Sequence, residues 1–260
     1  MGGMTVSILP EFALAFMLVF ARVGTMMMLL PGVGEQVAPQ RVRLSLAVFV
    51  TLLTIPIVRP AFTVVGLNLD LAVRLLVTEI LIGFTFGLAG RFLMSSLQTA
   101  GVLISQQIGL SFTMALDPTG GDRGQAAALG TFLSLLGISL ILASNLHHVA
   151  IAGIVDSYLT LRPGTLPPSG DAAQLALMVA NSAFITAVQI SAPFLVFGLV
   201  FNVGLGVLSR MMPQLQVFFL AMPAMILLGT VIFIFVLGLM MDGFLAHVTL
   251  VYRELFPGLR

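Results

Sequence analysis

The amino-acid sequence predicts an all-α, polytopic membrane protein made of long, kinked helical hairpins. Of its 260 residues, 59% are hydrophobic and only 8% are Asp, Glu, Lys or Arg, whereas an average soluble domain is about 25% charged. The apolar residues fall in runs of about 20 or more, the length at which a helix crosses a hydrocarbon core about 30 Å thick. Because runs such as VIFIFVLGLM at 231–240 lack the alternation of barrel strands, the spans are expected to be helical.

Six apolar stretches are expected to form these helices. The first has no basic residues before it and contains Glu11 and Arg22, which favours a membrane helix over a cleaved signal peptide. The last three are too long for one straight crossing and contain Gly or Pro, which predicts kinks or breaks. Short, punctuated connections leave no place for a separate soluble domain. The stretches are residues 8–30, 44–58, 71–94, 126–159 with Gly137 and Gly153, 175–208 with Pro193, and 217–244 with Pro223.

Charge and residue types exclude several classes of function. The 11 basic residues are all arginine and face 10 acidic residues, so the net charge of +1 gives no footprint for nucleic acid. With no cysteine, thiolate nucleophiles and zinc-thiolate sites are excluded. His147 and His148 are adjacent and project about 100° apart on a helix, unlike the i, i+4 pair that chelates one metal. We expect no enzyme, no metal site and no cofactor. The predicted loops divide the arginines five to five, so the sequence does not orient the protein in the membrane.

Charged residues inside the apolar stretches need partners, because one charge at the centre of a bilayer costs at least about 2.5–3.5 kcal/mol. Arg22, Arg74, Glu79 and Arg91 are the charges concerned. Glu79 lies five residues after Arg74, too far round a helix for an ideal pair, so an interhelical partner such as Arg22 is an equal candidate. We interpret Arg22, Arg74 and Glu79 as a structural ion-pair group; a proton relay is the alternative.

The segment 95–113 differs in kind, because its polar side chains recur mostly at spacings of three and four. This places small and amide side chains along one helical face. Uncharged hydroxyl and amide groups would hydrate a pore without binding any one ion strongly. The alternative is an interfacial helix packed by small residues. The residues of the proposed pore-facing helix are Ser95, Gln98, Thr99, Ser105 and Gln106.

Three apolar residues follow, Phe112, Met114 and Leu116, before Asp117-Pro118 begins a turn that Gly120 and Gly121 loosen. An apolar, glycine-ended loop beside a polar helix would make a deformable plug, and the flexible side chain of methionine suits this role. The alternative is that these residues anchor the loop in a core.

The sequence also resembles a known family. The stretches PGVGEQVAPQRVRLSLA at 31–47, TEILIGFTFGLAGRF at 78–92, QTAGVLISQQIGLSFTMALDP at 98–118 and NVGLGVLSRMMPQLQVFFLAMP at 202–223 are together similar to the FliR family of flagellar export proteins, whose injectisome counterpart is SctT. The resemblance covers essentially the whole chain.

The resemblance implies a subunit of the type III export gate in the bacterial inner membrane, within the flagellar basal body. It implies FliP, FliQ, FlhB and FlhA homologues as partners, unfolded flagellar proteins as substrates, contact with membrane lipid and no nucleic acid. Residues 1–189 would be FliP-like, with the pore-facing helix and plug at about 95–124, and 190–260 would be a FliQ-like hairpin and tail. Gly109 to Gly121 match the plug of the family.

Two other functions remain open from the sequence. A small-solute secondary transporter would use broken helices around a midplane site, which Pro193, Asn202 and Glu79 also suit. A structural scaffold would nucleate the ring of partners without touching substrate. In either an export gate or a scaffold, small residues on the FliQ-like hairpin would let helices approach closely. The expected assembly face includes Gly198, Asn202 and Gly206.

Overall fold

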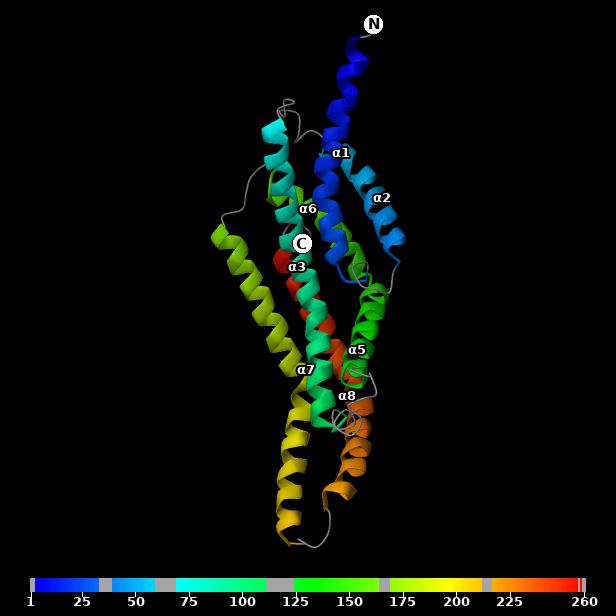
Figure 1. The fold of residues 1–260 in the computed structure, drawn as a ribbon, viewed down its shortest axis with the longest axis vertical. Helices are drawn as coiled ribbons and strands as arrows, with labels where there is room; N and C mark the ends of the chain where they lie inside the picture. The colour runs from blue at the N-terminus through cyan, green and yellow to red at the C-terminus, as the bar shows by residue number, and fades with distance from the viewer. Residues whose placement is uncertain are drawn as a thin grey trace. The chain divides into compact units, whose positions relative to one another are not determined.

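The computed structural model describes residues 3–32, 39–58, 69–110, 124–163, 169–211, 217–256 and 258. Within these ranges the chain forms α-helices and contains no strand, which confirms the predicted all-α class (Figure 1). The helices are α1 (Gly3–Leu29), α2 (Gln40–Val58), α3 (Leu69–Gln107), α5 (Gly124–Ala143), α6 (Leu146–Thr160), α7 (Ser169–Met211) and α8 (Val217–Leu255).

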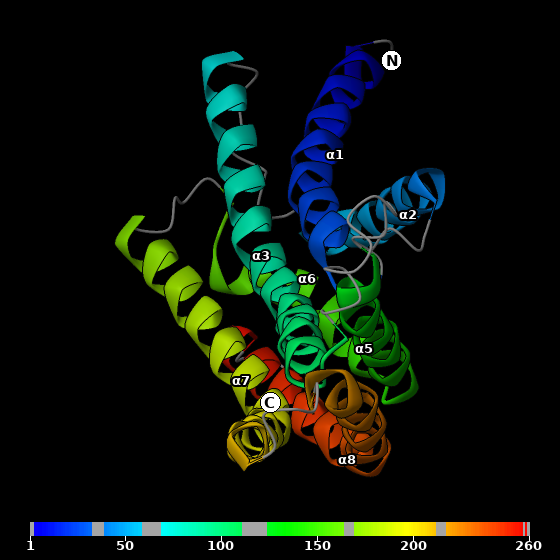
Figure 2. The ribbon, with the colours of Figure 1, turned by 60° about the horizontal axis from the view of Figure 1, so that its bottom comes forward.

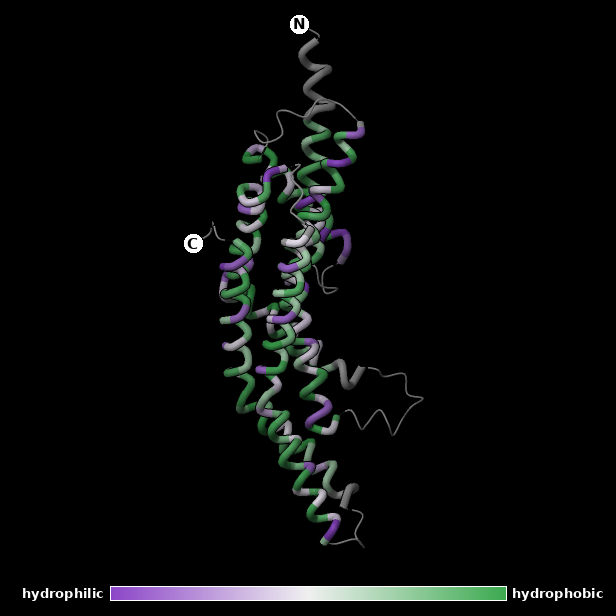
Figure 3. The backbone as a smooth tube through the Cα atoms, turned by 90° about the vertical axis from the view of Figure 1, so that its left-hand side faces the viewer, coloured by the Kyte–Doolittle hydropathy of each residue, from purple (hydrophilic) through white to green (hydrophobic). Residues whose placement is uncertain are grey.

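The described helices confirm a polytopic membrane protein. Five of them, α1, α2, α3, α7 and α8, are long and apolar enough to cross a bilayer, and the bent pair α5–α6 makes six if it counts as one span. Hydrophobic residues dominate most of their length, with hydrophilic residues scattered among them (Figure 3). The six spans correspond to the six predicted apolar stretches.

Three helices are much longer than a membrane is thick. Helices α3 and α8 have 39 residues each and α7 has 43. At 1.5 Å per residue, 39 residues extend about 58 Å, nearly twice a hydrocarbon core of about 30 Å. Pro193 and Pro223 lie inside α7 and α8, and both helices continue through them. The polar segment that follows residue 94 is a direct continuation of α3.

The break in the fourth stretch does not occur at the predicted glycines. It lies at Ser144–Asn145, where α5 and α6 bend by 76°. Asn145 takes up the turn with a φ of 59°, a left-handed conformation that asparagine tolerates better than most residues. Gly137 and Gly153 instead lie within α5 and α6. At both positions the missing side chain allows close packing. A Cβ on Gly153 would lie 2.6 Å from the ring of Phe256.

The helices pack into two units that alternate along the chain. Unit 1 contains residues 1–93, 141–180 and 249–260, and unit 2 contains residues 94–140 and 181–248. Helices α3, α5, α7 and α8 therefore contribute to both units. The predicted division into FliP-like and FliQ-like parts near residue 190 rests on resemblance rather than on packing, and it stays a prediction.

Unit 1 is built around α1, which lies beside α2 (Figure 2). Its core includes Leu18, Met26 and Ile82, all less than 2% exposed, and the stacked rings of Phe86 and Phe256, 5.6 Å apart. The core of unit 2 includes Phe194 of α7 and Phe233 of α8, with ring centroids 6.0 Å apart. Each unit thus has its own apolar core.

Candidate functional site

The predicted pore-facing residues lie on the part of α3 that belongs to unit 2. Gln98 and Gln106 are exposed, and Ser95 and Thr99 are half-buried. Ser105 differs, because it is completely buried and its hydroxyl donates a hydrogen bond to the Gly101 carbonyl oxygen at 2.7 Å. Four of the five predicted residues therefore share an accessible arc of α3, while Ser105 belongs to a helix contact.

That contact joins α3 to α5. A Cβ on Gly101 would collide with the backbone N and Cα of Gly130, and a Cβ on Gly130 would lie 2.9 Å from the Gln98 carbonyl oxygen. Ser134 donates to the Gly130 carbonyl at 2.8 Å, as Ser105 does to Gly101. Each helix thus presents a Gly-x-x-x-Ser pair, a spacing that permits close approach of helix backbones. The contact shows that one side of this segment packs against α5, and the pore-facing role of its accessible side stays a prediction.

Most of the predicted plug, Gly109 to Gly121, lies outside the described residues, because residues 111–123, here called the plug segment, are not described. This includes five of the predicted plug residues, namely Phe112, Met114, Leu116, Gly120 and Gly121. The structure describes both of its flanks. Helix α3 ends just before it, and α5 begins at Gly124 just after it.

Gly109, the remaining predicted plug residue, ends α3. Its φ is +82°, its N–H donates to the Gln106 carbonyl at 3.3 Å, and the Leu110 N–H donates to the Ser105 carbonyl at 3.0 Å. These two bonds and the left-handed residue between them form the Schellman motif, in which glycine is favoured because it carries no Cβ. Gly109 therefore determines where α3 ends.

The flank after the plug segment is held by the contact between Gly101 and Gly130, which are both six residues from the adjacent helix ends, Gln107 and Gly124. Neither Gly101 nor Gly130 is among the site residues predicted from the sequence. The Gly-x-x-x-Ser repeat in both stretches is the signal that could have identified the pair.

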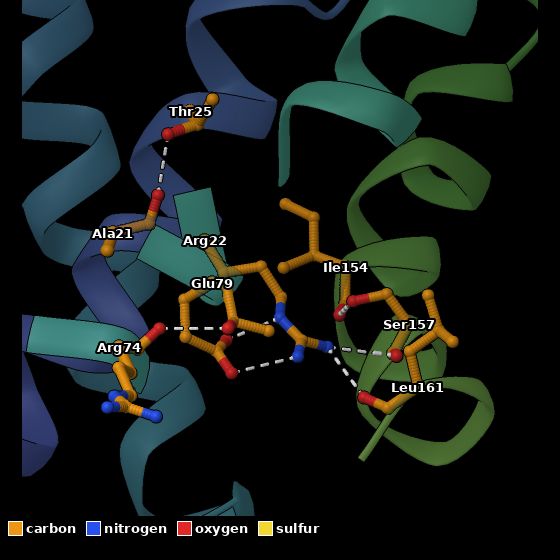
Figure 4. A network of polar contacts seen from close by, with 9 residues as sticks. Ala21, Arg22, Thr25, Arg74, Glu79, Ile154, Ser157 and Leu161 are labelled. Atoms are coloured by element: carbon orange, nitrogen blue, oxygen red, sulfur yellow. Dashed lines mark hydrogen bonds and ion pairs between the residues drawn. The ribbon is translucent and has the colours of Figure 1, made fainter. Parts of the chain in front are cut away.

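The charged group is centred on Arg22 of α1 and lies within unit 1 (Figure 4). Arg22 Nε donates to Glu79 Oε2 at 2.6 Å and Arg22 Nη2 donates to Oε1 at 3.1 Å, so the guanidinium binds both carboxylate oxygens. Both side chains are fully buried. Of the two partners considered for Glu79, the interhelical one is confirmed.

The rest of the guanidinium binds the end of α6. Arg22 Nη1 donates to the carbonyl oxygens of Ser157 and Leu161, both at 3.0 Å, and Arg22 Cζ lies 4.0 Å from the centre of the Tyr158 ring. The Ser157 carbonyl also accepts from the Leu161 N–H at 3.0 Å, and the C-terminal end of a helix stabilises a cation through the helix dipole. Arg22 consequently ties α1, α3 and α6 together.

Arg74 does not belong to this group, which corrects the prediction. Its Nη2 lies 3.1 Å from Asp70 Oδ2, one turn earlier on α3, and both side chains are about three-quarters exposed. The spacing from Arg74 to Glu79 places the two side chains on different sides of the helix, whereas i, i+4 partners share a face.

The three predicted assembly residues of α7 have different environments. Gly198 is buried, and a Cβ there would collide with Oε1 of Gln107 on α3. Asn202 is exposed and its Nδ2 donates to the Gly198 carbonyl at 2.8 Å, and a Cβ on Gly206 would meet no atom within 4 Å. Because α3 ends beside Gly198, the side of α7 that continues to Gly206 is open in the described part of the chain.

The described residues contain no group of three or more His, Cys, Asp or Glu side chains that could hold a metal ion. His147 and His148 stand in the first turn of α6 with ring centroids 4.1 Å apart.

Comparison with known proteins gives a consistent result. The family model described as "Bacterial export proteins, family 1" matches residues 13–251. The flagellar biosynthetic protein FliR of Caulobacter vibrioides is 42% identical over 94% of this chain and 97% of its own length. The FliR proteins of Pectobacterium carotovorum and Escherichia coli are 35% and 34% identical, over 85% and 76% of this chain and 82% and 75% of their own lengths.

Proposed function

The chain belongs to the bacterial export proteins, family 1, the family of FliR, and on this basis we propose that it forms part of the flagellar export gate. With FliP and FliQ homologues it would build the channel through which unfolded flagellar proteins cross the inner membrane. FlhB and FlhA homologues would adjoin the same assembly in the basal body.

The observation that carries this proposal is the course of α3. Its accessible arc bears Gln98 and Gln106 and leads to the glycine cap at Gly109, after which the apolar plug segment begins. Glycine contacts hold α3 and α5 on either side of that segment. A polar path ending in an apolar segment between two anchored helices is suited to a pore that is closed at rest.

A gate of this kind must meet two demands. It must pass unfolded chains, yet hold back ions, because leakage dissipates a gradient worth about 2.3 kcal/mol per charge per 100 mV. An apolar constriction made of flexible side chains meets both demands, since it can deform around a polypeptide and close again behind it. Phe112, Met114 and Leu116 would form this constriction.

Exposed apolar surface supports assembly with other subunits. On the second half of α7, Val203 and Met211 are 61% and 74% exposed, and on α8 Phe235 is 83% exposed. Helices about 58 Å long cannot lie wholly within a hydrocarbon core of about 30 Å. Partner helices would cover the apolar surface that lipid does not reach.

The surroundings of Glu79 argue against the small-solute transporter. A coupling carboxylate must exchange protons or ions, whereas both oxygens of Glu79 are bound by Arg22 and the side chain is completely buried. A structural scaffold agrees with the same contacts, but it predicts that the plug segment does not affect conductance.

The test is the conductance of purified complexes in planar bilayers. The chain is coexpressed with its FliP and FliQ homologues, and complexes with Phe112–Gly121 deleted are compared with the wild type after gel filtration confirms that both are intact. We expect higher conductance from the deletion. Phe49→Ala, which changes an exposed aromatic side chain of α2 outside the plug segment and outside the α7–α8 surface, is the control and should not change the conductance of assembled complexes.

Two results would contradict the proposal. Purification of the active chain without FliP or FliQ homologues would favour a transporter. Intact deletion complexes as tight to ions as the wild type would favour a scaffold, with the seal provided by the partners.

A further inference from the structure

The last turn of α3 contacts both arms of the α7–α8 hairpin, all within unit 2. Gln107 lies against Gly198 of α7, Ile108 lies against Gly229 of α8, and a Cβ on Gly109 would lie 3.4 Å from the Sδ of Met225. Three successive residues, the last residue of α3 and the two that follow it, therefore contact the hairpin directly before the plug segment begins. Two of the contacts occur where the hairpin has a glycine.

The contact at Gly229 is the more demanding of the two. A Cβ there would lie 2.5 Å from Cγ2 and 2.6 Å from Cβ of Ile108, while carbon atoms pack best at about 3.5–4.0 Å. Ile108 is 2% exposed, and its branched Cβ cannot move without its backbone. Alanine at 229 would consequently push the end of α3 by about 1 Å.

The contact at Gly198 can adjust more easily. The group that a Cβ would meet there is the amide of Gln107, the far end of a flexible side chain that is only half-buried. Rotation of that side chain would relieve the clash without moving α3. Gly229 thus has the larger influence on the position of the helix end.

We infer that Gly229 is a positioning residue for the gate: by admitting Ile108 it fixes the point on α8 from which the plug segment starts. This inference rests on the proposed function of that segment. Displacement of Ile108 moves the adjacent Schellman cap at Gly109, and with it the direction in which the chain leaves α3. The α7–α8 hairpin and the plug segment are thereby linked through one residue pair.

The chain offers matched variants for a test. Gly229→Ala adds a methyl group against Ile108, whereas Gly238→Ala adds the same group on the same helix where no atom lies within 4 Å. The double variant Ile108→Gly with Gly229→Ala adds the methyl group on α8 but removes the side chain that it would meet at position 108. The space between the two helices is thereby restored. Ile108→Ala loosens the contact without adding bulk, so it serves if Gly229→Ala does not assemble.

Two measurements are made on the intact complex with its FliP and FliQ homologues. Hydrogen exchange of peptides covering residues 104–110 reports on the end of α3, independently of gating. Planar-bilayer conductance reports on the gate. For Gly229→Ala and Ile108→Ala we expect faster exchange confined to 104–110 and raised conductance. Gly238→Ala should match the wild type, and the double variant should return both values toward it.

The outcomes separate this inference from the proposed function. Unchanged exchange at 104–110 in both Gly229→Ala and Ile108→Ala would overturn it. Faster exchange with unchanged conductance would also overturn it if deletion of Phe112–Gly121 raises conductance, because Gly229 would then have only a structural role. If that deletion has no effect on conductance, the proposed function fails, and the positioning role fails with it.

Discussion

The Arg22 cluster of unit 1 and the glycine contacts of unit 2 hold helices together by opposite means. In the first, the guanidinium of Arg22 on α1 reaches α3 and the end of α6 through four hydrogen bonds between 2.6 and 3.1 Å. In the second, Gly101, Gly130 and Gly229 make contact because they lack side chains. Directional bonds hold one region, and close approach of backbones and side chains holds the other.

The difference predicts how each region responds to substitution. A buried ion pair depends on chemical identity, because removing one partner leaves the other charge without compensation. A glycine contact depends on size, because one added methyl group forces the neighbouring atoms apart. Charge-conserving changes should therefore be tolerated better in the first region than in the second, and small apolar additions better on open faces than in contacts.

The largest effect is expected from Glu79→Gln, which removes the counter-charge of Arg22 and so tests the region held by directional bonds. Arg22 would stay buried without a counter-charge, a loss of about 3–5 kcal/mol. The accumulation of the subunit in membranes and its unfolding temperature in detergent should both fall. Arg74→Gln is the control, since the exposed pair of Arg74 with Asp70 contributes at most about 0.5 kcal/mol.

A double variant sharpens this prediction. Arg22→Met with Glu79→Leu removes both charges and should recover part of the stability, but not all of it, because the Leu161 carbonyl loses its donor. Normal accumulation of Glu79→Gln together with lost export would instead indicate a proton-coupled role for the carboxylate.

An intermediate effect is expected from Gly101→Ala, which tests the glycine contacts of unit 2. The methyl group would meet backbone atoms of Gly130 that cannot turn away, and overpacking typically costs about 1–3 kcal/mol. Thermal unfolding of the subunit is the measurement. Gly204→Ala, which adds a methyl group into open space, should be neutral or slightly stabilising because alanine favours the helix. Equal unfolding temperatures for Gly101→Ala and Gly204→Ala would show that the contact does not limit packing.

The smallest effect on the subunit itself is expected from Gly206→Leu. No atom lies within 4 Å of a Cβ at this position, so stability should change by less than about 0.5 kcal/mol. Incorporation into the complex should nevertheless fall, because a leucine would keep a partner helix at a distance. Copurification with the FliP and FliQ homologues measures this. Assembly equal to the wild type would show that Gly206 is not part of the interface.

Much of the fold follows from patterns along the chain. Apolar runs predicted the membrane helices, and the cost of a buried charge predicted a partner for Glu79. Each of these inferences needs only neighbouring residues or a single strong energetic requirement.

Other features depend on which helices meet in space, and these could not be predicted. Gly198 and Gly206 have the same chemistry and lie two turns apart, yet only Gly198 is covered, because α3 ends beside it. Ser105 was grouped with Gln98 and Gln106, but the approach of α5 at Gly101 buries it. The break between α5 and α6 falls at Asn145, although Gly137 and Gly153 are stronger helix breakers by propensity.

The alternation of the two units along the chain has a consequence for biosynthesis. Residues 1–93 leave the ribosome early, but unit 1 also needs residues 249–260, whose Phe256 stacks on Phe86 and lies against Gly153. In a nascent chain halted before residue 249, unit 1 would lack the Phe256 side chain that covers Phe86 and Gly153. Every segment of unit 2 would already be synthesised. Closure of the unit 1 core around Phe86 therefore waits until residues 249–260 have been translated.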